Sequence, residues 1–246
     1  MSSGLMMAPP GCGEASLHLG QLHLWFDPLP RRGYANMAVD ELLSAQPEPW
    51  LRVYAWAVPA VSYGYFDSAC EARRLFPGAE EYIRRWTGGG IVDHRLGQTY
   101  TLTLPAGGAP HPSSAQLYLQ IHSLLAAALA ADGVPCRLLR EDAPSGGRSC
   151  WASPVCSDIV DAAGHKLAGA GQRRHRGAVL HQGLVQQCEP RGEWPLLLAQ
   201  ALAEQPLVCR DAEPWGGFAS ALESLLENRY LRPEWEDEHR GCRYHS

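Results

Sequence analysis

The chain has a single lysine, Lys166, although arginine is abundant. Lysine and arginine together number 21, which leaves 20 arginines. An ammonium is a compact charge with a tunable pKa, whereas a guanidinium is planar and effectively always protonated. Codon bias can replace lysine by arginine wherever a solvated surface charge suffices, so a retained lysine marks a position where chemistry requires an ammonium. Lys166 is therefore the first candidate for a catalytic residue, with a solvated turn as the alternative.

A second candidate is Cys150, which follows the Ser/Gly loop SGGRS and comes just before a segment that leads to Lys166. Most cysteines are buried and inert. A flexible loop can expose this one, and a nearby ammonium would stabilise its thiolate and make it nucleophilic. Gly164 and Gly169 flank Lys166, a spacing that suits a turn presenting the ammonium to a pocket with a bare backbone wall.

The third chemical feature is the triplet Gly88, Gly89 and Gly90 in the segment RRWTGGGIVDH. A phosphate-binding P-loop would need a lysine and a hydroxyl residue in register, and these are missing here, as is the dinucleotide G-x-G-x-x-G pattern. What remains is a glycine turn between two strands. Such a turn either lets backbone N–H groups approach a ligand closely or simply closes a tight hairpin.

The elements that must position these residues follow from the hydrophobic pattern. Asn36 can cap a short helix, residues 51–57 alternate as a half-buried strand would, and Ser113 with Gln116 forms a capping box for a helix that Gly133 ends. Further strands are expected at 60–66, 99–105, 154–162 and 177–186, and further helices at 195–204 and 218–229. Two strands follow one another around 155–187 without a helix, which predicts an α+β fold with a mixed, largely antiparallel sheet flanked by helices.

Composition narrows the class of protein. The chain has 246 residues, a net charge of -5 and no block of five like charges, which disfavours nucleic-acid binding. The longest apolar run, 124–131, is far shorter than the ~20 residues of a membrane-spanning helix. The N-terminus lacks a secretory pattern and the eight cysteines form no C-x-x-C pair. We therefore expect a cytoplasmic protein with reduced thiols, no membrane association and no metal site.

Five segments appear in the order NMAVDELL, VYAWAVPAVSYGYF, RRWTGGGIVDHRLGQ, GHKLAGAGQRR and LHQG. Together, from about Tyr34 to Gln187, they resemble the biotin/lipoate protein ligase A/B family, which includes lipoate-protein ligases and cysteine-dependent octanoyltransferases. The resemblance implies a fold related to class II aminoacyl-tRNA synthetases. The expected domain arrangement is a flexible N-terminal tail at 1–20, a catalytic domain at 21–210 and a C-terminal helical extension at 211–246.

The resemblance also implies roles for individual residues. Lys166 matches a lysine that binds the acyl carbonyl or an adenylate, and Cys150, followed by Trp151, stands where the transferases carry their nucleophile. The residues implied to bind substrate are Arg85, Thr87, Gly88, Gly89, Gly90, His94, Gly169, Gln172, His181 and Gly183. His94 and His181 could instead be structural histidines. Asp158 either orients Lys166 or is a polar residue of its strand without a role in the site.

The resulting functional hypothesis is an acyltransferase that moves an octanoyl or lipoyl group onto a lysine of a lipoyl carrier domain through a Cys150 thioester, without a cofactor. The donor would be acyl carrier protein, and the acceptor the glycine-cleavage H protein or a 2-oxoacid dehydrogenase acyltransferase subunit. Arg173, Arg174 and Arg176 form either a docking patch for these acidic partners or a solvated face. The alternatives are a lipoate-protein ligase that uses ATP and Mg²⁺, which the segment HRLGQ favours, and a non-catalytic acyl-binding relative.

Overall fold

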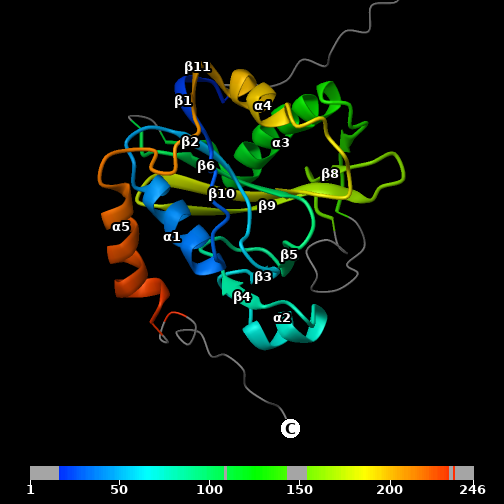
Figure 1. Ribbon diagram of the computed structural model, residues 1–246. Coiled ribbons are helices and arrows are strands. Elements are labelled where there is room, and N and C mark those ends of the chain that lie inside the picture. Colours follow the sequence, from blue (N-terminus) through cyan, green and yellow to red (C-terminus); the bar gives the residue numbers. More distant parts are fainter. Residues whose placement is uncertain (1–16, 108–109, 143–153, 233–234, 236–246) are drawn as a thin grey trace, which may run out of the picture.

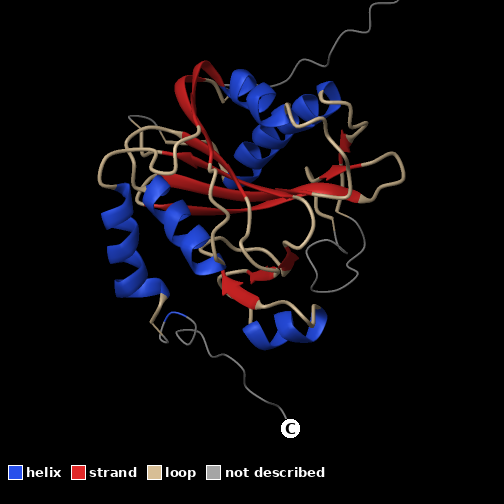
Figure 2. Cartoon of the chain, viewed as in Figure 1, coloured by secondary structure: helices blue, strands red, loops and turns tan. Residues whose placement is uncertain are grey.

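The computed structural model describes residues 17–107, 110–142, 154–232 and 235, and within them two sheets and five helices (Figures 1 and 2). The main sheet has eight strands in the order β11-β1-β2-β6-β10-β9-β8-β7, and a small sheet has the order β4-β3-β5. The strands are β1 (Leu19–Phe26), β2 (Trp50–Tyr54), β3 (Ala60–Tyr63), β4 (Glu81–Arg84), β5 (Val92–Asp93), β6 (Gln98–Leu104), β7 (Arg137–Leu138), β8 (Ile159–Val160), β9 (Lys166–His175), β10 (Ala178–Val185) and β11 (Ala203–Cys209). The helices are α1 (Gly33–Ser44), α2 (Ala69–Leu75), α3 (Ser114–Ala131), α4 (Trp194–Leu202) and α5 (Phe218–Leu225), the last extended by a π-helical turn, η1 (Leu226–Tyr230).

The main sheet is mixed. Strand β1 lies parallel to both β11 and β2, and the pairs from β2 through β6, β10, β9 and β8 to β7 are antiparallel. The consecutive strands β8, β9 and β10 have no helix between them. The predicted α+β fold with a largely antiparallel sheet is therefore confirmed.

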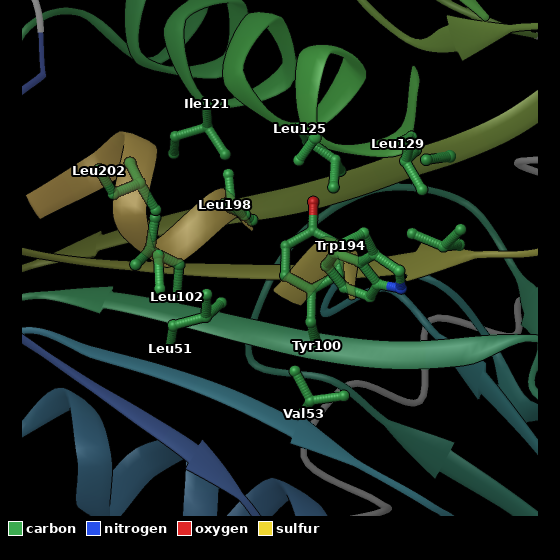
Figure 3. Close-up of a cluster of buried hydrophobic side chains, with 14 of the residues drawn as sticks. Leu51, Val53, Tyr100, Leu102, Ile121, Leu125, Leu129, Trp194, Leu198 and Leu202 are labelled. Carbon is green, nitrogen blue, oxygen red and sulfur yellow. The ribbon is translucent and has the colours of Figure 1, made fainter. Parts of the chain in front are cut away.

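Helices cover both faces of the main sheet, with α3 and α4 on one side and α1 and α5 on the other (Figure 2). The first face holds the larger hydrophobic core, in which Leu102 and Tyr100 of β6 meet Leu125 of α3 and Trp194 of α4 (Figure 3). A second cluster joins α1 and α5 through Met37 and other apolar side chains. The part of the predicted C-terminal extension that the structure describes thus packs on the body of the fold.

Helix α3 begins and ends as its sequence predicts. The Ser113 hydroxyl accepts a hydrogen bond from the Gln116 backbone N–H, and the Gln116 side chain accepts one from the Ser113 N–H, so both halves of the capping box are formed. Gly133 follows the helix with a positive φ of 94°, which glycine adopts without strain.

Two expectations near the N-terminal half are wrong. Helix α1 begins at Gly33 rather than after Asn36, whose fully buried amide oxygen instead accepts a hydrogen bond from Arg52 at 2.7 Å. Strand β2 is buried along its whole length and not half-exposed. Its Arg52 is buried because Asp27 and Asp40 neutralise it, and a period-two pattern cannot reveal such a pairing.

Three further expectations concern the segments that carry the candidate site residues. The triple glycine does not close a hairpin, because the strands on either side of it, β4 and β5, both pair with β3 in between. Lys166 is not in a turn, because it is the first residue of β9. The expected strand at 154–162 is reduced to two residues, since Ser157 has a positive φ of 71° that interrupts an extended chain.

In the part of the chain that the structure describes, no helix is both long and apolar enough to span a bilayer.

Candidate active site

Lys166 buries its side chain at the start of β9. Its Nζ lies 2.7 Å from Oδ2 of Asp158, and neither side chain is more than 1% exposed. The same carboxylate accepts hydrogen bonds from the Val155 N–H at 2.8 Å and from the Tyr118 hydroxyl at 2.5 Å. Of the two alternatives for Asp158, orientation of Lys166 is the one that the geometry supports.

A narrow pocket lies beside this ion pair, with a cavity volume of about 30 Å³, or about 440 Å³ when all the empty space up to its open mouth is counted. A side chain at Gly169, in the pocket wall, would overlap Cε and Nζ of Lys166. The ammonium therefore lies against the bare backbone of Gly169, in the space that a side chain there would fill. The lining residues come from both sheets and from α1: Met37, Tyr54, Trp56, Arg85, Gly88, Gly89, Val92, His94, Thr99, Gly169, Ala170, Gly171, Gln182, Gly183 and Leu184.

The floor of the pocket is a row of residues that crosses four strands. Gly169 of β9 pairs with Leu184 of β10, which pairs with Thr99 of β6, which pairs with Tyr54 of β2. Adjacent strands are about 4.8 Å apart, so the row extends for about 14 Å from the Lys166 end. A long, narrow floor of this kind suits a slender linear ligand.

Arg85 and Thr87 hold the triple-glycine segment over this floor. The buried guanidinium of Arg85 donates to the Gly90 carbonyl at 2.8 Å and to Ser62 Oγ at 2.7 Å. The hydroxyl of Thr87 donates to Oε1 of Gln182 in β10 at 2.9 Å. Both side chains thus fix the segment's position against β3 and β10.

Glycine is required where this segment meets β9. A Cβ at Gly171 would overlap the Gly88 carbonyl oxygen and the Thr87 hydroxyl, so the two backbones can touch only because no side chain is present. Gly89 has a positive φ of 99°, which side chains rarely permit, whereas Gly88 faces open space. The bare backbone thus forms the roof of the pocket.

His94 closes the pocket end that lies away from Lys166. Its Nε2 lies 2.6 Å from Ser62 Oγ and its Nδ1 lies 3.2 Å from Thr99 Oγ1. Its ring stacks on Trp56 with centroids 4.2 Å apart. Burial, and secondarily the charge of Arg85, hold the pKa of His94 well below its ordinary value, so the ring is neutral. A ring bonded through both nitrogens fits the structural alternative better than a general base.

Gln172 and His181 lie on the other face of the main sheet. Successive side chains of a strand alternate between faces, and their neighbours Gly171 and Gln182 face the glycine segment. His181 instead bonds to Tyr100 at 3.1 Å and to Gln172 at 3.0 Å, within the core beneath α3. These two residues are therefore not among those that line the pocket.

The pocket brings together most of the other residues singled out in the sequence. Its lining includes Arg85, Gly88, Gly89, His94, Gly169 and Gly183. Thr87 and Gly90 do not line it, but hydrogen bonds made by the Thr87 hydroxyl and the Gly90 carbonyl fix the glycine segment in place. Cys150 lies outside the described residues. Arg173 lies over the Trp86 ring at 4.2 Å, and Arg174 donates to Ser114 Oγ at 3.1 Å, so both guanidinium groups already have partners within the fold.

Sequence reasoning did not single out Tyr118 or Gln182. Gln182 joins Thr87 to Asp40, whose Oδ2 lies 2.7 Å from its amide nitrogen. Both Gln182 and Asp40 stand inside the quoted segments LHQG and NMAVDELL, so a signal for them existed. Tyr118 occupies an ordinary position of α3, where the sequence gives no signal. Among the described residues, no cluster of three His, Cys, Asp or Glu side chains could hold a metal ion.

The fold and the pocket define the class of protein: an α+β domain with a mixed, largely antiparallel sheet, whose glycine-walled pocket lies next to a buried lysine. Residues 32–187 match the lipoyl protein ligase A/B catalytic domain, which is more than half of the chain. The chain belongs to this family.

Similar proteins are found both among curated sequences and among solved structures. The chain is 31% identical over 169 residues to octanoyltransferase LipM of Symbiobacterium thermophilum, covering 63% of this chain and 61% of that protein. It is 33% identical over 171 residues to octanoyltransferase LipM of Moorella thermoacetica, covering 62% and 60%. The match spans about three fifths of the length of these curated relatives. A lipoate-protein ligase A structure bound with ATP covers 90% of this chain and 99% of its own, with a TM-score of 0.63 and 19% identity, which shows the shared fold.

Proposed function

We propose that this protein transfers an octanoyl or lipoyl group from acyl carrier protein to a lysine of a lipoyl carrier domain, through a thioester on Cys150. The observation that carries the proposal is the buried ammonium of Lys166, which Asp158 holds against the bare backbone of Gly169 in the pocket wall. Sequence relatives named octanoyltransferases support acyl transfer. The catalytic unit would be residues 21–210, with 211–246 as a helical extension.

The pocket suits the acyl chain. Its floor crosses four strands over about 14 Å, and its walls combine bare glycine backbone with apolar side chains such as Met37 and Leu184. A chain lying on this floor would place its carbonyl carbon at the Gly169 end, next to Lys166. The Trp56 and His94 rings would then meet the methyl end.

The proposed chemistry has two displacements at the acyl carbon. The Cys150 thiolate attacks the thioester carbonyl of the donor, a carbon–sulfur bond to Cys150 forms, the carbon–sulfur bond to the carrier breaks, and the carrier leaves as a thiolate. The neutral lysine amine of the acceptor then attacks the enzyme thioester, an amide forms, and the carbon–sulfur bond to Cys150 breaks. The Cys150 thiolate is released, and the proton lost by the amine goes to the carrier's thiolate. In both steps the carbonyl oxygen becomes negative, and an oxyanion donor such as Lys166 is typically worth about 3 kcal/mol of transition-state stabilisation.

The chain length after Cys150 permits this arrangement. Five residues lead from Cys150 to Val155, and five residues span at most about 18 Å. The Val155 N–H donates a hydrogen bond to the carboxylate that holds Lys166. Val155, five residues after Cys150, therefore lies within the lysine site. This connection supports a Cys150 thiol within reach of Lys166.

The test is intact-mass spectrometry of the protein after incubation with octanoyl carrier protein. The wild-type protein should gain one octanoyl group, and Cys150→Ala should gain none, because the nucleophile is removed. A matched control is Cys70→Ala, since Cys70 is an exposed cysteine of α2 outside the pocket lining. Acylation of Cys150→Ala at the wild-type level would end the thioester mechanism.

The competing function is an ATP-dependent lipoate-protein ligase, which the ATP-bound structure with the same fold favours. In that case Lys166 would contact an acyl-adenylate and Cys150 would be incidental. Lipoate-dependent release of pyrophosphate from ATP, with Cys150→Ala as active as the wild-type protein, would establish the ligase. Acyl binding in a thermal-shift assay, with no modified lipoyl domain under either condition, would indicate a non-catalytic relative.

A further inference from the structure

The carboxylate of Asp158 has partners on both of its oxygens. Oδ2 faces the Lys166 ammonium at 2.7 Å and the Val155 N–H at 2.8 Å, and Oδ1 accepts from the Tyr118 hydroxyl at 2.5 Å. Asp158 itself is fully buried. Because the ammonium is paired with this carboxylate, whatever fixes the carboxylate helps to fix Lys166.

Tyr118 connects that carboxylate to the pocket wall. Its hydroxyl oxygen accepts a hydrogen bond from the backbone N–H of Ala170 at 3.0 Å, and Ala170 lines the pocket. A phenol has one proton to donate, and a backbone N–H can only donate. The direction of both bonds is therefore settled: Ala170 donates to Tyr118, and Tyr118 donates to Asp158.

The surroundings keep Tyr118 in its donor form. Burial, and then the negative charge of Asp158, raise the pKa of Tyr118 well above its ordinary value, so the phenol stays protonated. Its ring lies 4.0 Å from the ring of His122, one helical turn further along α3. His122 Nδ1 bonds to the carbonyl of Ser157 at 2.7 Å, which restrains the residue just before Asp158.

We propose that Tyr118 is a positioning residue for Lys166, acting through Asp158 to hold the ammonium against Gly169 at the end of the pocket. Without the hydroxyl, Oδ1 would lose its donor and would compete with Oδ2 for the ammonium. The lysine could then turn toward Oδ1 and away from the position that a developing oxyanion requires. This inference rests on the proposed function, which assigns Lys166 to the reacting carbonyl.

The test compares Tyr118→Phe with Tyr82→Phe in single-turnover acylation by octanoyl carrier protein. Tyr82 is a matched control, because its hydroxyl also donates to an acceptor, the Phe76 carbonyl at 2.8 Å, and also accepts from a backbone N–H, that of Ala79 at 3.3 Å. It lies in β4 and does not line the pocket. Both variants keep the aromatic ring, and each loses one hydrogen bond that the hydroxyl donates and one that it accepts from a backbone N–H.

Tyr118→Phe should lower the maximal acylation rate by about tenfold or more, as small displacements of a catalytic group do. The donor concentration at half-maximal rate should stay within about twofold, because the hydroxyl does not touch the substrate. Tyr82→Phe should acylate at the wild-type rate. In a Lys166→Met background, Tyr118→Phe should cause no further loss, since its effect passes through the lysine.

A second measurement does not depend on activity. Lys166 is the only lysine of the chain, so protein labelled with ¹⁵N at the lysine Nζ gives one side-chain signal. Tyr118→Phe should shift this signal, and Tyr82→Phe should not. The signal also reports whether Tyr118→Phe retains a folded lysine site.

The outcomes separate the inference from the function on which it rests. If the wild-type protein forms no acyl-enzyme, the proposed function fails and this inference falls with it. If the wild-type protein is acylated but Tyr118→Phe matches it in rate and in Nζ signal, or Tyr82→Phe loses as much rate, only the inference is overturned.

Discussion

The ammonium of Lys166 remains in the interior because Asp158 offers an oxygen at 2.7 Å. An unpaired buried charge would cost several kcal/mol. The pair is in turn fixed by the N–H of Val155 and the hydroxyl of Tyr118, so the ammonium is oriented before any ligand arrives. Preorganised charge of this kind stabilises a developing oxyanion without first having to move.

Gly169→Ala tests whether the contact between the lysine and the pocket wall matters. A methyl group there would overlap Cε and Nζ of Lys166 and would lie 2.9 Å from Asp158 Oδ1. The lysine side chain is flexible and can yield, so the fold should persist while the ammonium shifts. We expect the acylation rate to fall by roughly tenfold to a hundredfold, less than the loss of a whole oxyanion donor.

The measurement is single-turnover acylation together with thermal unfolding. Gly20→Ala serves as the control, because Gly20 lies in β1 with open space around the position of a Cβ. That variant should behave as the wild-type protein in both assays. An undiminished acylation rate in Gly169→Ala would show that the position of Lys166 against this wall is not needed.

At the residue scale, the site could be predicted only where residue type was unusual. The single lysine and the triple glycine are unusual in type, whereas the sequence leaves the role of Asp158 open. Tyr118 could not be found, because a tyrosine on an amphipathic helix usually packs in a core. Its role depends on the pairing of β9 with its neighbours, which brings Ala170 to its hydroxyl.

At the element scale, the sequence predicts those helices and strands that have a clear local signal, such as a capping box or an alternation of apolar and polar residues. The capping box predicts the start of α3, and alternation predicts β6. Strands β1 and β11 were not predicted, since they pair with each other from opposite ends of the chain and β11 is mostly exposed. Neither the burial of both faces of β2 nor the separation of β4 from β5 is encoded locally.

Arg52 is the element-scale link between β2, α1 and the loop after β1. It is fully buried and donates to Asp27 at 2.7 Å and to Asp40 at 2.9 Å. Arg52→Met should leave two buried carboxylates without this partner and lower the free energy of unfolding by about 3–5 kcal/mol, the usual cost of breaking a buried pair from one side. Urea denaturation measures the change.

A matched variant separates burial from charge. Arg74→Met removes an arginine of α2 that is 67% exposed and pairs with Glu71, so solvent already screens the interaction. Its free energy of unfolding should equal that of the wild-type protein. If Arg52→Met were as stable as Arg74→Met, the buried network would not be holding β2 to α1.

At the scale of the whole molecule, buried neutral histidines couple stability to pH. Burial is the largest cause in each case: it lowers the pKa of His94 and of His181 well below the ordinary value and that of His122 to about 4. His122 of α3 and His181 of β10 lie together between the helix and the sheet, next to Tyr118, with ring centroids 5.5 Å apart. Protonation of either would place an unpaired charge in the core.

The sign of the effect follows from the lowered pKa values. Below the ordinary histidine pKa of 6.5, the unfolded chain binds protons at these histidines and the folded protein does not. The free energy of unfolding is therefore highest above pH 6.5 and falls as the pH drops toward about 4. Between pH 7.5 and 5.5 each such histidine should remove about 1.4 kcal/mol from the free energy of unfolding. Urea denaturation at the two pH values measures the loss.

The control variant His122→Asn keeps a donor for the Ser157 carbonyl but cannot titrate. Its free energy of unfolding should therefore fall by about 1.4 kcal/mol less than that of the wild-type protein over this range. Equal losses in the two proteins would mean that His122 is not held neutral by the fold.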